Sequence, residues 1–142
     1  MLTAKFYRKI PLKIINQCPE LMIDHVSDGT RISQDEQCWY AFFNENGEVV
    51  GCVNMGWDRY EYKNGMPSWT IYIYLFEVAK KFKHQGYARQ MVEWIENLPC
   101  VGAIELMHVD RKIDYSLSYN FWSHMGWKYN DRWEHRMIKK LK

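Results

Sequence analysis

The chain has 142 residues, of which 47% are apolar and 25% are charged, a length and composition suited to one globular domain with one core. The formal net charge of +2 is too small by itself to indicate a nucleic-acid or anionic-membrane partner. The N-terminal segment MLTAKFYRKIPLKII interrupts its apolar residues with four lysines and arginines, and no stretch is long enough to cross a bilayer. We therefore expect a single domain over residues 1–142, located in the cytoplasm, with no membrane partner.

Cysteine and histidine spacing argues against a metal site. The four cysteines form no CxxC pair, and the five histidines show no ligand spacing with cysteines or carboxylates. We expect the thiols to be reduced and buried. They are Cys18, Cys38, Cys52 and Cys100.

The first quarter of the chain contains weak signals followed by one clear strand. Residues 3–8 alternate weakly and predict a first strand. Apolar residues recur at helical spacing over 12–25, but Pro19 interrupts them, which predicts a short or broken helix. A polar loop is expected over 27–36, and the run CWYAFF predicts a strand at 38–43.

Two further strands are expected in the middle of the chain. Asn46-Gly47 is a strong type I′ hairpin signal, because both residue types tolerate positive φ. It predicts a partner strand over 48–57, followed by a polar loop over 58–68. Residues 69–78 are apolar or aromatic on both faces until Glu77, a pattern typical of a central strand covered on both sides.

The second half alternates helices and strands. Residues 86–98 carry apolar side chains at three- and four-residue steps, which predicts an amphipathic helix that Pro99 ends. A strand over 102–109, a short helix over 116–125 closed by glycine, and a final hairpin over 127–139 are expected next. This order predicts an α/β (α+β) fold with a mixed, mostly antiparallel central sheet flanked by helices.

The start of the helix at 86–98 has an unusual distribution of charge. No Ser, Thr, Asp or Asn caps it and no acidic residue lies in its first turn, although the helix dipole favours one there. A phosphate would satisfy both the free N–H groups and the dipole, and Gly86 would let the backbone approach it closely. An ordinary solvated basic loop is the alternative. The basic residues here are Lys80, Lys81, Lys83, His84 and Arg89.

Two segments resemble motifs of the GNAT acyltransferases. Residues 83–88, KHQGYA, resemble the acetyl-CoA signature Gln/Arg-x-x-Gly-x-Gly/Ala, with Lys83 in place of the usual Gln or Arg. Lysine keeps a positive donor but loses the planar fork of arginine. Residues 115–127 are similar to the later helix pattern that ends in Gly-Phe, with Trp122 where the family has Tyr. The two segments occur in the family's order, and the resemblance covers residues 37–138.

The resemblance implies the GNAT fold and acetyl-CoA as co-substrate. In this family the pantetheine arm lies along the fourth strand like an added strand, and the pyrophosphate is held by backbone N–H groups of the following loop. The helix that begins near Tyr115 would pass beneath the thioester. The implied cofactor-binding residues are Phe76, Glu77, Val78, Lys83, His84, Gln85, Gly86, Tyr87, Ala88, Arg89, Tyr115 and Trp122.

The resemblance also implies a general acid, but the position where the family has it is occupied by Trp122 in this sequence. The family often uses the Tyr at the position of Trp122 to protonate the leaving thiolate, and an indole N–H is not a useful acid. Tyr119 lies one helical turn earlier and is our candidate replacement. Tyr115 is the second candidate.

A general base is equally hard to find. The family's carboxylate or histidine positions on the fourth strand hold Tyr72 and Tyr74, whose phenols are poor bases at neutral pH. Glu105 on the next strand is our candidate, with His108 and Glu77 as alternatives.

We expect an N-acetyltransferase that moves an acetyl group from acetyl-CoA to a primary amine of a small molecule or protein by direct attack in a ternary complex. The alternative is a catalytically weak CoA-binding or regulatory protein of the same fold, which the tryptophan at position 122 favours. An RNA-directed enzyme is a third reading, and the low net charge gives it little support. A homodimer is compatible with the sequence, since two-fold dimers are the commonest assembly.

Overall fold

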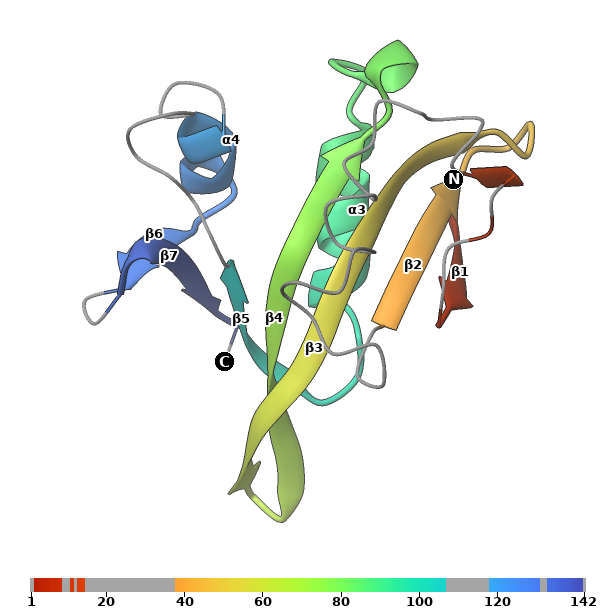
Figure 1. The fold of residues 1–142 in the computed structure, drawn as a ribbon. Helices are drawn as coiled ribbons and strands as arrows, with labels where there is room; N and C mark the ends of the chain where they lie inside the picture. The colour runs from red at the N-terminus through yellow and green to blue at the C-terminus, as the bar shows by residue number, and fades with distance from the viewer. Residues whose placement is uncertain are drawn as a thin grey trace. The chain divides into compact units, whose positions relative to one another are not determined.

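The structure is a computed structural model that describes residues 2–8, 11, 13–14, 38–106, 118–130 and 133–141 (Figure 1). The chain forms two compact units. The first comprises Met1–Gly56 and Leu75–Ile95, and the second comprises Trp57–Tyr74 and Glu96–Lys142. Strands β3 (Val49–Lys63) and β4 (Met66–Val78) contribute residues to both units.

The first unit contains three antiparallel strands in sequence order. Strand β1 (Thr3–Tyr7) pairs with β2 (Cys38–Phe43), and β2 pairs with the beginning of β3. The end of β4 lies on the other side of β3, where the amide of Ala79 donates to the carbonyl of Val50 at 2.8 Å. The strands predicted at 3–8 and 38–43 are thereby confirmed.

Helix α3 (Tyr87–Glu96) packs on this sheet and confirms the helix predicted over 86–98. The ring of Trp94 lies 4.9 Å from that of Tyr40 and 5.3 Å from that of Phe42, between centroids. Gly51 allows the close approach, because a Cβ there would lie 2.5 Å from the carbonyl oxygen of Glu77 and 2.9 Å from Sδ of Met91. The helix buries Met91, Val92 and Ile95.

The turn between β2 and β3 differs from the predicted type I′ turn. Gly47 has a φ of 77°, but Asn46 does not adopt a positive φ. The Gly47 amide donates to the Asn44 carbonyl at 3.0 Å, so the hairpin closes through a longer loop whose glycine alone is left-handed. The hairpin was predicted correctly, but the turn type was wrong.

The polar loop predicted over 58–68 is also wrong. In the second unit, β3 continues to Lys63 and β4 begins at Met66. The two residues between them, Asn64 and Gly65, have φ values of 54° and 79°, which is the type I′ pattern. Polar residues on a strand exposed to water do not prevent strand formation when the turn residues favour a tight hairpin.

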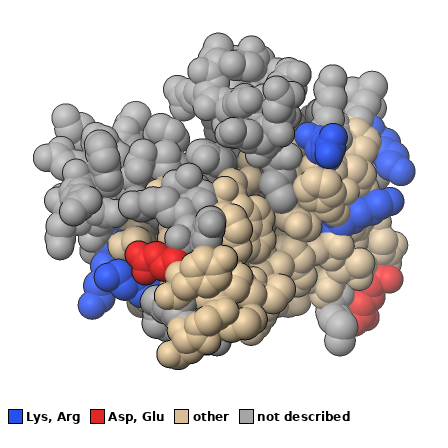
Figure 2. All heavy atoms as spheres, turned by 90° about the horizontal axis from the view of Figure 1, so that it is seen from below, with Lys and Arg blue, Asp and Glu red and all other residues tan. Residues whose placement is uncertain are grey.

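The hairpin carries exposed apolar side chains near its tip. Tyr62 is 69% exposed, Met66 60% and Trp57 38%, and the Trp57 ring meets that of Trp69 edge-on at 6.0 Å. Figure 2 views the molecule from below and shows that much of the described surface on that face carries no charged side chain.

The rest of the second unit adds one parallel and two antiparallel pairs. Strand β5 (Val101–Leu106) runs parallel to β4, with pairs from Trp69↔Val101 to Ile73↔Leu106. Strand β7 (Trp133–Lys140) is antiparallel to both β5 and β6 (Lys128–Asn130). The mixed, mostly antiparallel sheet and the final hairpin confirm the predicted fold class.

Helix α4 (Ser118–His124) ends in a Schellman motif at Gly126, whose φ is 97°. The Trp127 amide donates to the Trp122 carbonyl at 2.9 Å and the Gly126 amide to the Ser123 carbonyl at 3.0 Å. The Nζ of Lys139 donates to the Met125 carbonyl at 2.8 Å. The glycine stop predicted for this helix is confirmed.

Several other predictions have mixed outcomes. Cys52 is buried as expected, but the prediction is wrong for Cys100, which is exposed in the turn before β5 with a φ of 63°. Cys18, most of the helix predicted over 12–25 and the loop over 27–36 lie outside the described residues. Among the residues that are described, no helix has the length and apolarity to span a membrane, and no cluster of three metal-ligating side chains occurs.

Candidate functional site: the loop before helix α3

The loop that leads from β4 to α3 is ordered by a single turn of 3₁₀ helix, η2 (Lys80–Phe82). Phe82 anchors this turn: it is 9% exposed, and its ring packs perpendicular to that of Tyr87 at 5.6 Å. The chain then passes through left-handed conformations at His84 (φ 64°) and Gly86 (φ 85°) before the helix begins at Tyr87. A left-handed φ at the non-glycine residue His84 is uncommon and costs backbone energy.

Six successive backbone amides, those of residues 84–89, face no acceptor among the residues that the structure describes. The first amide of the helix to find one is that of Gln90, which donates to the Gly86 carbonyl at 3.3 Å. Free N–H groups at a helix start, preceded by left-handed residues, form concavities that bind anions. The arrangement fits a phosphate or pyrophosphate.

The electrostatics of the loop favour the same kind of ligand. No acidic residue lies in the first turn of α3. Lys83 and Arg89 are exposed, and neither has a carboxylate partner in the described part of the chain. Their charges therefore add to the positive end of the helix dipole.

One lysine of the loop is held elsewhere. The Nζ of Lys81 lies 2.9 Å from Oε2 of Glu48, at the turn between β2 and β3. Asn44 donates to the other oxygen of the same carboxylate at 3.2 Å. These hydrogen bonds, chiefly that from Lys81, hold the pKa of Glu48 below its usual value. The β2–β3 turn thus contacts the loop through this exposed ion pair.

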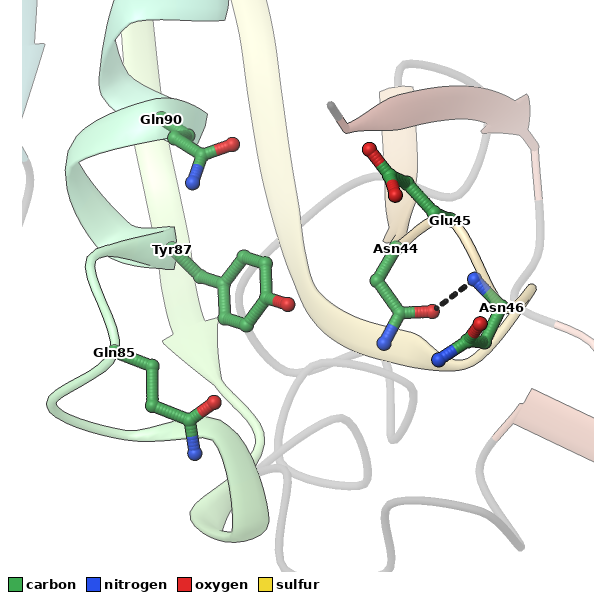
Figure 3. Close-up of a pocket in the computed structure, with 6 residues that line it drawn as sticks. All are labelled: Asn44, Glu45, Asn46, Gln85, Tyr87 and Gln90. Carbon is green, nitrogen blue, oxygen red and sulfur yellow. Dashed lines mark hydrogen bonds between the residues drawn. The ribbon is translucent and has the colours of Figure 1, made fainter.

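An open polar pocket of about 330 Å³ lies between that turn and the start of α3 (Figure 3). Tyr87 points from the helix toward the turn, and the Asn44 side chain accepts from the Asn46 amide at 3.0 Å. The side-chain Nε2 of Gln85 donates to the Lys81 carbonyl at 3.2 Å. The pocket is lined by Asn44, Glu45, Asn46, Gln85, Tyr87 and Gln90.

The end of β4 presents backbone groups on the edge away from β3. Ala79 uses its amide to bond Val50 of β3. Neighbouring residues of a strand direct their backbone groups to opposite edges, so the N–H of Val78 points away from β3. Phe76, Glu77 and Val78, predicted to line the pantetheine arm, are all half-buried here.

The predicted catalytic residues belong to the second unit, whereas the loop belongs to the first. Glu105 lies on β5 in register with Tyr72, and Tyr119 lies in α4, but the side chains of Glu105 and Tyr119 are outside what the structure describes. Trp122 is 5% exposed, and its ring packs 4.9 Å from that of Trp127. Tyr115 lies outside the described residues.

The sequence reading missed two features that shape the loop. Phe82 is the lone apolar residue in a run of lysines, and this contrast could have marked it as an anchor. The ion pair between Glu48 and Lys81 joins residues 33 positions apart, and no local pattern indicates it.

Comparison with known proteins gives the family of the chain. Residues 7–127 match the Acetyltransferase (GNAT) family. The chain belongs to the GNAT acetyltransferase family. The predicted family membership is therefore confirmed over most of the sequence, and the signature loop and the glycine-closed helix both fall inside the match. No curated protein sequence matches the chain.

Solved structures share the GNAT fold at low sequence identity. An AtaT toxin mutant bound to the C-terminus of the antitoxin AtaR is 14% identical with a TM-score of 0.65, covering 99% of this chain and 92% of its own. A GNAT-family protein from Desulfovibrio desulfuricans is 12% identical with a TM-score of 0.64, covering 100% and 99%. The Bacillus subtilis N-acetyltransferase YlbP, in complex with coenzyme A, is 18% identical with a TM-score of 0.58, covering 97% of each chain.

Proposed function

We propose that this GNAT protein transfers an acetyl group from acetyl-CoA to a primary amine of a small molecule or a protein. The six amides of residues 84–89, which have no acceptor among the described residues, carry the proposal. Such a set of open donors at a helix start, beside the exposed side chains of Lys83 and Arg89, is suited to bind an anion. The pyrophosphate of acetyl-CoA supplies that anion.

The residues of the first unit would divide the work of binding. Backbone N–H groups from His84 to Arg89 would hold the pyrophosphate, with Lys83 and Arg89 adding charge. The outward edge of β4 at Phe76–Val78 would hold the pantetheine arm as an added strand. The YlbP structure, which contains coenzyme A, is consistent with this assignment for a protein of the same fold.

The chemistry would be a direct acyl transfer. The neutral amine nitrogen bonds to the thioester carbonyl carbon, the carbon–sulfur bond breaks, and the amine loses a proton while the thiolate gains one. The N–H of Val78 would stabilise the oxyanion. Tyr119 would protonate the thiolate, and Glu105 would take the amine proton, directly or through water.

The proposal is tested by calorimetric titration of acetyl-CoA and CoA into the wild-type protein, Gly86→Trp and Gly65→Trp. The two glycines match closely: φ is +85° at Gly86 and +79° at Gly65, and a Cβ at either would meet no atom within 4 Å. Both variants therefore suffer the same backbone strain, but only Gly86→Trp places a ring over the open amides. We expect Gly86→Trp to abolish binding and Gly65→Trp to retain it.

Failure of the wild-type protein to bind either molecule would overturn the proposal, as would equal loss of binding in both variants. Binding is then followed by a screen of amines for release of free thiol. Binding without turnover on any amine would instead favour the catalytically weak CoA-binding protein, a reading that the buried Trp122 supports because its indole supplies no acid.

A further inference from the structure

Asn54 is the one polar residue that is fully buried in the described part of the chain, with an exposed fraction of 0%. Neither its Nδ2 nor its Oδ1 has a hydrogen-bond partner. It lies on β3 between Val53 and Met55, which are also fully buried, and its register partner on β2 is the buried Trp39. Leaving an amide unsatisfied in such surroundings costs about 1–3 kcal/mol, and valine or leucine would fill the position without that cost.

The position of Asn54 relates it to the proposed cofactor strand. Gly51 of β3 faces Met91 of α3. Because side chains alternate along a strand, Asn54 points to the opposite face, the same one as Cys52. It lies four residues from Val50, which bonds Ala79 at the end of β4, or roughly 13 Å along the strand. The direction from Val50 to Asn54 therefore runs back along β4, away from the loop, and an extended pantetheine arm would run the same way.

We propose that Asn54 binds the amine acceptor through an amide group that neighbours the reacting nitrogen. This inference rests on the proposed acetyltransferase function and adds the chemical class of its acceptor. A side-chain amide has donors on one atom and an acceptor on the other, so a second amide satisfies both orphan atoms. A carboxylate does not, because it would leave Oδ1 unpaired and would itself be buried without a counter-charge.

The apolar neighbours of Asn54 favour an acceptor with an apolar side chain. Its neighbours on that face, Cys52 two residues earlier on β3 and Trp39 in register on β2, are buried and uncharged. L-Leucinamide and L-leucine are therefore suitable probes, because they share the same side chain and amine and differ only in that leucinamide has an amide where leucine has a carboxylate. As Asn54 is fully buried, a ligand reaches it only through a local opening of the chain.

The test measures dissociation constants of both probes at a fixed excess of CoA, for the wild-type protein and Asn54→Leu. We expect the wild type to bind leucinamide more tightly than leucine. In Asn54→Leu, leucinamide binding should weaken about tenfold to a hundredfold, so the preference for leucinamide over leucine falls. Thermal stability should stay the same or rise, because an orphan amide is removed. Asn54→Val provides the same measurement if the leucine variant does not fold.

Cys52→Val is the matched control, because it changes a buried neighbour on the same face and leaves the Asn54 amide in place; both constants should stay within about twofold. Unchanged leucinamide affinity in Asn54→Leu, a wild-type preference for leucine, or no binding of either probe would overturn the inference. A clear loss of stability in both Asn54→Leu and Asn54→Val would also overturn it, since the Asn54 side chain would then have partners within the folded protein. CoA binding by the same proteins tests the proposed function separately: if CoA binds normally while the preference is absent, only the role of Asn54 fails.

Discussion

The start of α3 and the end of α4 solve the same physical problem in opposite ways. Both are helix termini, each has a left-handed glycine, and each leaves backbone groups without partners inside the helix. At the end of α4, Gly126 closes a Schellman motif and Lys139 bonds the Met125 carbonyl. At the start of α3, the amides of residues 84–89 have no acceptor within the described part of the chain. One terminus satisfies its polar groups internally, and the other leaves them open to solvent or to a ligand.

The contrast extends to the charged side chains. Lys139 is a quarter exposed, lies 2.7 Å from Glu96 and sits over the Trp127 ring, so its charge is balanced within its unit. Lys83 and Arg89 are exposed, and neither has a partner in the part of the chain that is described. A terminus that breaks the usual capping rules is a better pointer to function than one that obeys them.

The largest expected difference between the two termini is their response to a side chain at the glycine. Gly126→Ala forces a Cβ into a left-handed residue and within 3.3 Å of Lys139 Cε, so we expect a loss of about 2 kcal/mol in the free energy of unfolding. Gly86→Ala carries the backbone strain alone and should lose about 1 kcal/mol. Denaturant unfolding of both variants measures this. Equal losses, or a larger loss at Gly86, would contradict the comparison.

The sequence predicted the end of α4 better than the loop before α3. The glycine stop and the apolar spacing are local signals, so α3, α4 and the last hairpin were found with small errors. The ion pair from Glu48 to Lys81 joins residues 33 positions apart, and the left-handed φ of His84 is uncommon for a non-glycine residue. Neither has a local signature, and the 3₁₀ turn is marked only by the apolar Phe82 in a run of lysines.

The two Asn-Gly pairs make the same point. Both have the type I′ composition, but only Asn64-Gly65 adopts that turn. At Asn46-Gly47 the side chain of Asn44 accepts from the amides of Asn46 and Glu48, and these bonds stabilise a different loop. The dipeptide correctly predicts a hairpin at Asn46-Gly47, whereas at Asn64-Gly65 the polar residues on either side favour a loop prediction that the structure contradicts.

An intermediate effect is expected from a negative charge in the first turn of α3. Arg89→Glu places a carboxylate where the helix dipole favours it, and the free energy of unfolding should rise by about 0.3–1 kcal/mol. The same charge repels a phosphate, so CoA affinity should fall about tenfold or more. Lys128→Glu makes the same change of charge at an exposed residue of β6 and should leave both quantities nearly unchanged. If Arg89→Glu weakened neither CoA binding nor the salt dependence of that binding, the open amides would not be the anion site.

The smallest effect concerns Glu48, whose carboxylate draws Lys81 away from the open loop. Hydrogen bonds from Lys81 and Asn44 hold the pKa of Glu48 below its ordinary value of 4.5. A lowered pKa in the folded state contributes stability that is present above the ordinary value and is lost as the pH falls through the folded value. The difference in stability between the wild type and Glu48→Gln should therefore be small and constant near neutral pH, because the pair is exposed, and should vanish in acid.

In the same variant, Lys81 is freed from its partner and should raise CoA affinity by less than about threefold. Denaturant unfolding of both proteins at a series of pH values measures the difference in stability. A difference that grows as the pH falls below 4.5 would show that the pKa of Glu48 is raised instead.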